Sequence, residues 1–124
     1  MKEVLIYSGS ILIFIWGAVH IFPVKSIVKG FNKDSKDNIL IITMEWIAEG
    51  LALAFLGILV FLVTILSDTV NSVSNIVYLS CAVMLLVLAL LSLFTGARTS
   101  VLPMKLCPVI KTITALTFLY PVVF

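Results

Sequence analysis

The side chains of this chain that are capable of acid–base or ligand chemistry lie inside long apolar stretches. His20 lies within the first stretch, Glu45 and Glu49 lie within the second, and Cys107 and Lys111 lie within the last. An imidazole and a carboxyl group shielded from water both titrate near neutral pH, so a His–Glu pair could move a proton. A carboxylate and an ammonium group in the same surroundings would instead form an ion pair. What these groups do depends on whether the fold brings them together.

The composition indicates that lipid is the solvent for most of the chain. Of its 124 residues, 62% are hydrophobic and 11% are charged, whereas globular domains are about half apolar and about a quarter charged. A chain this short cannot hide so much apolar surface in one water-soluble core. The composition therefore excludes a nucleic-acid reader, a cytosolic enzyme, a secreted disulfide scaffold and a disordered linker.

Four apolar stretches are long enough to cross a membrane as helices, since a crossing takes about 20 mostly apolar residues. The sequence predicts an all-α fold, an integral membrane four-helix bundle that forms a single transmembrane domain over residues 1–124. The helices are expected at about 4–23, 38–66, 75–97 and 103–123.

The segment after the first helix is expected to lie at the membrane surface. An amphipathic turn at about 24–31 has apolar residues on one face, from Val24 to Phe31, and lysines off that face. We expect the apolar face to point toward the lipid and the lysines to lie near anionic headgroups. Beyond the turn, Ser35 or Asp37 is expected to cap the second long helix.

Basic residues predict the orientation of the helices. With four crossings, the first and third loops share one side of the membrane, and both termini share the other. The Lys and Arg residues of the first side are Lys25, Lys29, Lys33, Lys36, Arg98 and Lys105, whereas the second side has Lys2. Short loops rich in Lys and Arg stay in the cytoplasm. We therefore predict a multi-pass protein of the cytoplasmic (inner) membrane with both termini outside.

The ionisable groups within the predicted spans gather in the cytoplasmic half. Counting about 20 residues from each outer helix end places His20 and Glu49 about one turn inside the lipid, and Lys111 about two turns inside. A charge that faces lipid costs roughly 2.5 to 3.5 kcal/mol at a helix centre, so these groups should point into the bundle. Glu45 and Glu49 are four residues apart and share one helix face. We predict that Glu49 pairs with Lys111 across two helices.

The sequence therefore predicts a polar pocket in the inner half of the bundle. Its candidate lining residues are His20, Glu45, Glu49, Lys111, Arg98, Cys107, Trp16 and Trp46. Phe118 is expected to share an apolar wall with the two tryptophans. No catalytic residue, metal site or cofactor is predicted.

Each candidate also has a purely structural interpretation. The pair of Glu49 and Lys111 could simply join two helices, and His20 could be a hydrogen-bonded anchor near a helix end. Arg98 is expected as a headgroup anchor and Trp46 as an interfacial residue. These alternatives stay open on the sequence alone.

The two cysteines are expected to remain unpaired. At about 1.5 Å of rise per residue, Cys81 and Cys107 differ in depth by roughly 20 Å, and a disulfide requires Cα atoms within about 7 Å of one another. The chain has no C-x-x-C motif of the redox or metal-binding type. Cys81 is expected to be a small packing residue.

Three segments resemble those of a known group of membrane proteins. They are GAVHIFP at 17–23, MEWIAEGLALAFLG at 44–57 and GARTSVLPMKLCP at 96–108. They resemble small four-helix membrane proteins of bacteria or archaea, broadly of the DoxX-like type. The resemblance covers the size, the helix count and the positions of Gly and Pro. It supports the four-helix architecture and assigns no catalytic residue.

Three functions are compatible with the sequence. The first is a binding or accessory subunit whose pocket holds a lipid, a quinone or a partner helix, and its small-residue stripes also suit a homo-oligomer or a partner membrane subunit. The second is a membrane enzyme of the isomerase or oxidoreductase type, in which His20 and a glutamate act on an amphipathic substrate. The third is a small proton-coupled transporter that uses Glu49. A nucleic-acid partner is not expected, because the net charge of +2 reflects lysines at the membrane surface.

Overall fold

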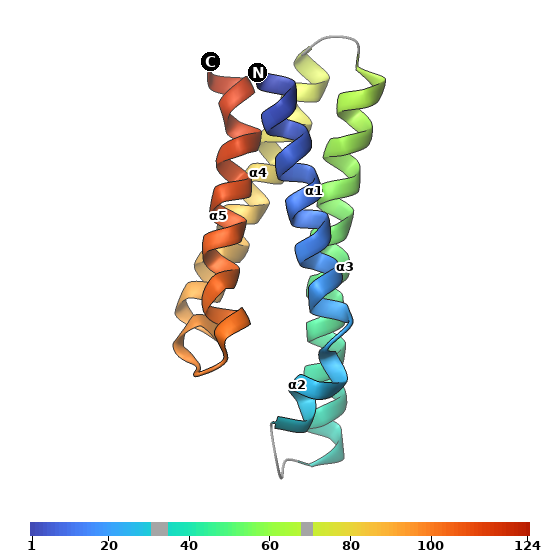
Figure 1. Ribbon diagram of the computed structural model, residues 1–124, viewed down its shortest axis with the longest axis vertical. Coiled ribbons are helices and arrows are strands. Elements are labelled where there is room, and N and C mark those ends of the chain that lie inside the picture. Colours follow the sequence, from blue (N-terminus) through green and yellow to red (C-terminus); the bar gives the residue numbers. More distant parts are fainter. Residues whose placement is uncertain (31–34, 68–70) are drawn as a thin grey trace.

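The computed structural model describes residues 1–30, 35–67 and 71–124, which form helices and no strands (Figure 1). The all-α prediction is thus confirmed for this part of the chain. Phe31 and Lys33, which contribute to the predicted turn and loop charge, lie outside the described residues. The elements are α1 (Lys2–Ile21), α2 (Val24–Gly30), α3 (Lys36–Leu66), α4 (Ser72–Phe94), the short 3₁₀ helix η1 (Gly96–Arg98) and α5 (Leu102–Val123).

The four long helices form two pairs. α1 packs along α3, α4 packs along α5, and the contact between α1 and α5 joins the pairs. α3 and α4 contact each other much less extensively. Both termini, the end of α3 and the start of α4 lie at one end of the bundle, which we call the terminal end; α2 and η1 lie at the other, which we call the α2 end (Figure 1).

Four helical segments are long and apolar enough to cross a membrane, and they begin at Lys2, Lys36, Ser72 and Leu102. Each begins one to three residues before the predicted start, because polar or flanking residues join the helix ahead of the apolar run. α3 has 31 residues, which at about 1.5 Å of rise per residue makes it about 15 Å longer than a hydrocarbon core of about 30 Å. Part of α3 therefore extends beyond the apolar layer of any bilayer that these helices cross.

The first turns of α3 and α4 are capped by side chains. Of the two residues predicted to cap α3, Ser35 is the cap: its side-chain oxygen accepts a hydrogen bond from the backbone N–H of Asn38 at 3.3 Å. Asn71 caps α4 in a reciprocal capping box with Ser74. These bonds satisfy backbone donors that have no partner within the helix.

A contact between glycines brings α1 and α3 close together at the level of the candidate site. A Cβ atom on Gly17 would lie 2.6 Å from the carbonyl oxygen of Gly50, and one on Gly50 would lie 2.8 Å from the carbonyl oxygen of Gly17. Any larger residue would therefore collide with backbone, which cannot rotate away as a side chain can. Gly17 is one turn before His20, and Gly50 follows Glu49. The close approach of the helices thus places these two polar side chains near each other.

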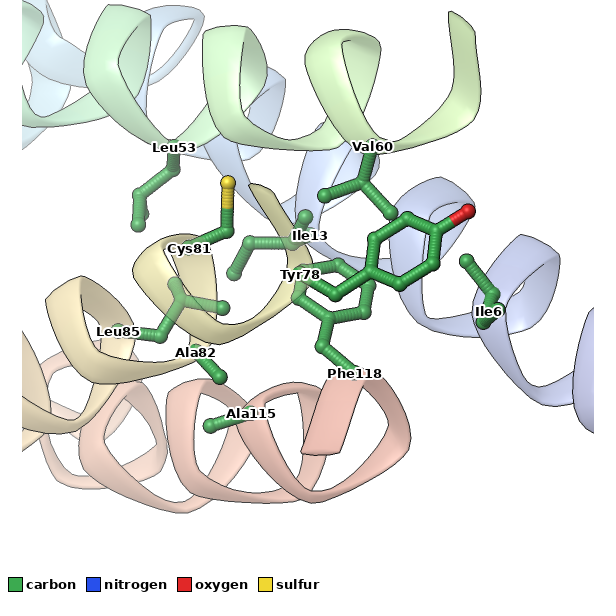
Figure 2. Close-up of a cluster of buried hydrophobic side chains, with 10 residues drawn as sticks. All are labelled: Ile6, Ile13, Leu53, Val60, Tyr78, Cys81, Ala82, Leu85, Ala115 and Phe118. Atoms are coloured by element: carbon green, nitrogen blue, oxygen red, sulfur yellow. The ribbon is translucent and has the colours of Figure 1, made fainter. Parts of the chain in front are cut away.

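The main apolar core lies between all four long helices (Figure 2). Its fully buried members include Ile13, Leu53, Leu85 and Phe118, and Cys81 packs among them as predicted. Phe118 belongs to this core and Trp16 packs against it, and of the three aromatic residues expected to share a wall of the pocket only Trp46 lines it, so the prediction of that shared wall is wrong.

The apolar face of α2 also differs from its prediction. Val24 and Val28 are buried against Trp46 of α3 instead of facing lipid. The long α3 extends past the end of α1 (Figure 1) and offers an apolar surface on which α2 packs. Lys25 and Lys29 are exposed, as expected for residues off the apolar face.

Replacing Gly17 with alanine is expected to lower the free energy of unfolding by about 1 to 3 kcal/mol, since overpacking of a close contact carries a cost of this size. The reason is that the added Cβ meets the backbone of α3. The measurement is thermal or denaturant unfolding of the purified protein in detergent.

The matched control is Gly96→Ala. A Cβ there would meet no atom nearer than the Met104 side chain at 3.6 Å, so its stability should equal that of the wild type. Equal stability of both variants would contradict the proposed glycine contact.

Candidate functional site

Three helices bring the candidate polar side chains together between the main core and the α2 end. His20 lies in the last turn of α1, Glu49 lies near the middle of α3, and Cys107 and Lys111 lie one turn apart on α5. Each belongs to the face of its helix that points into the bundle, where His20, Cys107 and Lys111 are buried. We call His20, Glu49, Cys107 and Lys111 the polar cluster.

The predicted ion pair between Lys111 and Glu49 is present. The Lys111 side chain is 0% exposed, while that of Glu49 is 32% exposed. The Lys111 ammonium also donates a hydrogen bond to Ser92 Oγ at 2.7 Å and lies 3.5 Å from the carbonyl oxygen of Leu88. A buried charge is tolerated when it is paired and its remaining donors are satisfied. The contacts of Lys111 meet both requirements.

The imidazole of His20 is held in one orientation. Its Nδ1 lies 2.9 Å from the backbone carbonyl oxygen of Trp16. Because a carbonyl oxygen can only accept a hydrogen bond, Nδ1 carries the proton of the neutral ring, and the unprotonated Nε2 is the acceptor for the Cys107 thiol. Nε2 lies 3.6 Å from Cys107 Sγ, to which the Trp16 indole N–H donates at 3.5 Å.

His20 and Glu49, the proton-transfer pair considered from the sequence, lie close together but form no direct hydrogen bond. His20 Nε2 lies 4.0 Å from Glu49 Oε2, beyond hydrogen-bonding distance. The group nearest to the free nitrogen of His20 is the Cys107 thiol, which lies 3.9 Å from Glu49 Oε1. The ligand atoms of His20, Glu49 and Cys107 all lie within 4.8 Å of one another.

A cavity of about 540 Å³ lies beside the polar cluster. Its walls are mostly apolar side chains of α3 and α4, and His20, Glu49, Cys107 and Ser92 line it as well. Ala48 and Ala52, on the Glu49 side of α3, are exposed and line this cavity. That side of α3 is therefore open to the cavity and is not covered by another helix.

The other predicted site residues lie at different distances from the cluster. The Trp46 ring is 5.5 Å from the His20 ring between centroids, and Trp46 and Glu45 both line the cavity. Arg98 does not join the site: it is exposed at the α2 end, with its guanidinium carbon 5.8 Å from the centroid of the Phe94 ring.

Ser92 was not predicted as a site residue, although a serine inside an apolar span is itself a signal of contact between helices.

No family model, curated protein or solved structure matches this chain. The DoxX-like resemblance therefore stays a prediction.

Single substitutions in the ion pair are expected to be strongly destabilising. Lys111→Met leaves the carboxylate of Glu49 without its partner, and Glu49→Gln leaves a fully buried ammonium without its counter-charge. Breaking a buried pair costs about 3 to 5 kcal/mol, and the partial exposure of Glu49 places both variants near the lower value. The measurement is unfolding in detergent.

The double variant Glu49→Gln with Lys111→Met is expected to lose less stability than the sum of the two single variants, because neither charge is then left unpaired. Glu45→Gln is the matched control, since Glu45 is exposed and one turn away on the same helix. Strictly additive single effects would refute the coupling between the two side chains.

Proposed function

We propose that this chain is a multi-pass protein of the cytoplasmic membrane that binds an amphipathic small molecule in the cavity beside the polar cluster. The observation that supports this proposal is that the cavity has mostly apolar walls and a small number of polar side chains among them. Small-molecule sites have this character: an apolar enclosure with a few polar groups that orient the ligand. The cavity also has a volume typical of such sites, which is about 300 to 1,000 Å³.

The distribution of basic residues supports an orientation with both termini outside. Among the described residues, the Lys and Arg residues at the α2 end are Lys25, Lys29, Lys36, Arg98 and Lys105, and Lys2 belongs to the terminal end. Positive residues favour the cytoplasmic side. In this orientation the cavity lies in the cytoplasmic half of the bundle, at the depth where a membrane lipid carries its polar head.

The lining of the cavity suits a ligand with a polar head. His20, Glu49, Ser92 and Cys107 supply polar groups among mostly apolar walls. The head of a quinone or of a lipid would lie against these groups, and its chain would lie along the apolar walls.

A second candidate function is a membrane enzyme that acts on an amphipathic substrate. The observation that favours it is the free Nε2 of His20 beside the Cys107 thiol, since a nucleophile next to a base that is itself oriented by a third group is the arrangement of covalent catalysis. Turnover lost in His20→Asn with the fold retained would favour this candidate over simple binding.

Ligand binding can be measured through the protein's own fluorescence. The chain has two tryptophans, of which Trp46 lines the cavity and Trp16 contacts Cys107. A short-chain quinone, which quenches indole emission on contact, is expected to quench the wild-type protein in detergent with a saturable dependence on concentration. Vesicles that contain brominated lipid provide the corresponding experiment for a lipid ligand.

Ala52→Phe is expected to weaken saturable quenching at least tenfold, because the added ring occupies the cavity that Ala52 lines. Leu51→Phe is the matched control: Leu51 is the adjacent residue, is exposed and is not part of the cavity wall. Quenching that does not saturate and is equal in all three proteins, with both quenchers, would overturn the proposal.

A further inference from the structure

We propose that His20, Glu49 and Cys107 bind a divalent transition-metal ion of the Zn²⁺ type. One coordination position of this ion would be open to the cavity. The proposal rests on the geometry of these three side chains and not on the proposed amphipathic ligand.

The three donor groups are those that Zn²⁺ prefers. Zinc in proteins is bound by imidazole nitrogen, thiolate sulfur and carboxylate oxygen. Here one group of each kind comes from a different helix, α1, α3 and α5, and the three donor atoms lie within 4.8 Å of one another. Glycine contact between α1 and α3 and the packing of α5 on α1 hold the three helices in place.

The separations of the donor atoms are close to those around a tetrahedral ion. Bond lengths of about 2.3 Å to sulfur and about 2.0 to 2.1 Å to nitrogen and oxygen imply ligand atoms about 3.3 to 3.6 Å apart. In the structure, Cys107 Sγ is 3.6 Å from His20 Nε2 and 3.9 Å from Glu49 Oε1, whereas His20 Nε2 is 4.0 Å from the other carboxylate oxygen, Oε2. With one oxygen from Glu49, the three donor atoms lie within 4.8 Å of one another, so a rotation of the Glu49 carboxylate and a movement of about 1 Å would close the triangle on an ion.

The surrounding hydrogen bonds are those of a metal site. A histidine ligand typically donates its second ring N–H to a carbonyl or carboxylate, and a carboxylate ligand is itself hydrogen-bonded. His20 Nδ1 faces the Trp16 carbonyl, which leaves Nε2 free for an ion. The Glu49 oxygen Oε1 is held by Lys111, which leaves Oε2 on the side of His20. Ser92 in turn holds Lys111.

The charges of the site are compatible with a divalent ion. With neutral thiol and imidazole groups, the carboxylate of Glu49 and the ammonium of Lys111 cancel. Binding of the ion displaces one proton from the Cys107 thiol and changes the net charge of the cluster from 0 to +1, with the partly exposed Glu49 carboxylate in contact with both the ion and Lys111. An ion next to thiolate and carboxylate ligands is stable in a site of low polarity, since coordination replaces its hydration.

Three protein ligands leave the fourth tetrahedral position available, as in catalytic zinc sites. His20, Glu49 and Cys107 all line the cavity, so that this position faces it. A water molecule, or an oxygen of the amphipathic ligand, would complete the coordination. The last step rests on the proposed function, whereas binding of the ion itself does not.

The test uses Co²⁺ as a spectroscopic probe for the same site. Protein purified in detergent and treated with a chelator is titrated with Co²⁺, and a thiolate-to-cobalt charge-transfer band in the near ultraviolet is expected to saturate at one ion per chain. Addition of Zn²⁺ should abolish this band by displacement. The absence of a saturable band in the wild-type protein would overturn the proposal.

Variants assign the ligands. Cys107→Ala should abolish the band, and His20→Asn should weaken Co²⁺ binding at least tenfold. Cys81→Ala is the matched control, because Cys81 is the other buried thiol and lies in the apolar core on α4; its band should equal that of the wild type. A band that persists in Cys107→Ala, or that disappears in Cys81→Ala, would refute the assignment.

Thermal unfolding provides a second readout that does not depend on colour. Zn²⁺ should raise the melting temperature of the wild type and of Cys81→Ala but not that of Cys107→Ser. The serine variant is included because the alanine variant could fold poorly.

The quinone titration, repeated in the presence of chelator, separates the two proposals. Saturable quenching in the absence of an ion would support the proposed function even if the metal site is absent.

Discussion

The buried ammonium of Lys111 sets a condition that much of the surrounding structure meets. A charge that is fully removed from solvent needs a counter-charge and acceptors for its remaining protons, and Lys111 finds them in Glu49, Ser92 and the backbone of Leu88. These partners come from α3 and α4, whereas Lys111 belongs to α5. The need of the Lys111 ammonium for a counter-charge and hydrogen-bond acceptors thus favours one arrangement of α3, α4 and α5.

The cavity is a consequence of how the helices are paired. Extensive packing of α1 on α3 and of α4 on α5, with little contact between α3 and α4, leaves a region between the pairs that side chains do not fill. The polar cluster lies at its wall because α1 and α5, which meet each other, carry His20 and Cys107 on their shared faces. The apolar core of Figure 2 occupies the same position between the pairs nearer the terminal end.

The all-α fold, the four long helices and the ion pair could be predicted because each follows from the order of residues along one stretch of the chain. Hydrophobic length identifies a span, and the cost of a charge in lipid indicates that Glu49 and Lys111 must meet. The core position of Phe118 and the packing of α2 on α3 depend on the rotation and axial offset of whole helices. Neither quantity follows from the apolar pattern of a single helix. The depth of His20, Glu49 and Cys107 in their spans predicted that they share a pocket, but the distances between their ligand atoms could not be predicted, because these residues lie far apart in the chain and form no spaced motif.

The bond between Glu49 and Lys111 joins one helix pair to the other, since Glu49 belongs to α3 and Lys111 to α5. Sliding of one pair past the other along the bundle axis would stretch or break this bond, whereas bending of both pairs together would leave it intact. The ion pair of the Glu49 carboxylate is therefore coupled to the axial register of the two helix pairs. A change that weakens this ion pair would also allow one helix pair to slide along the other.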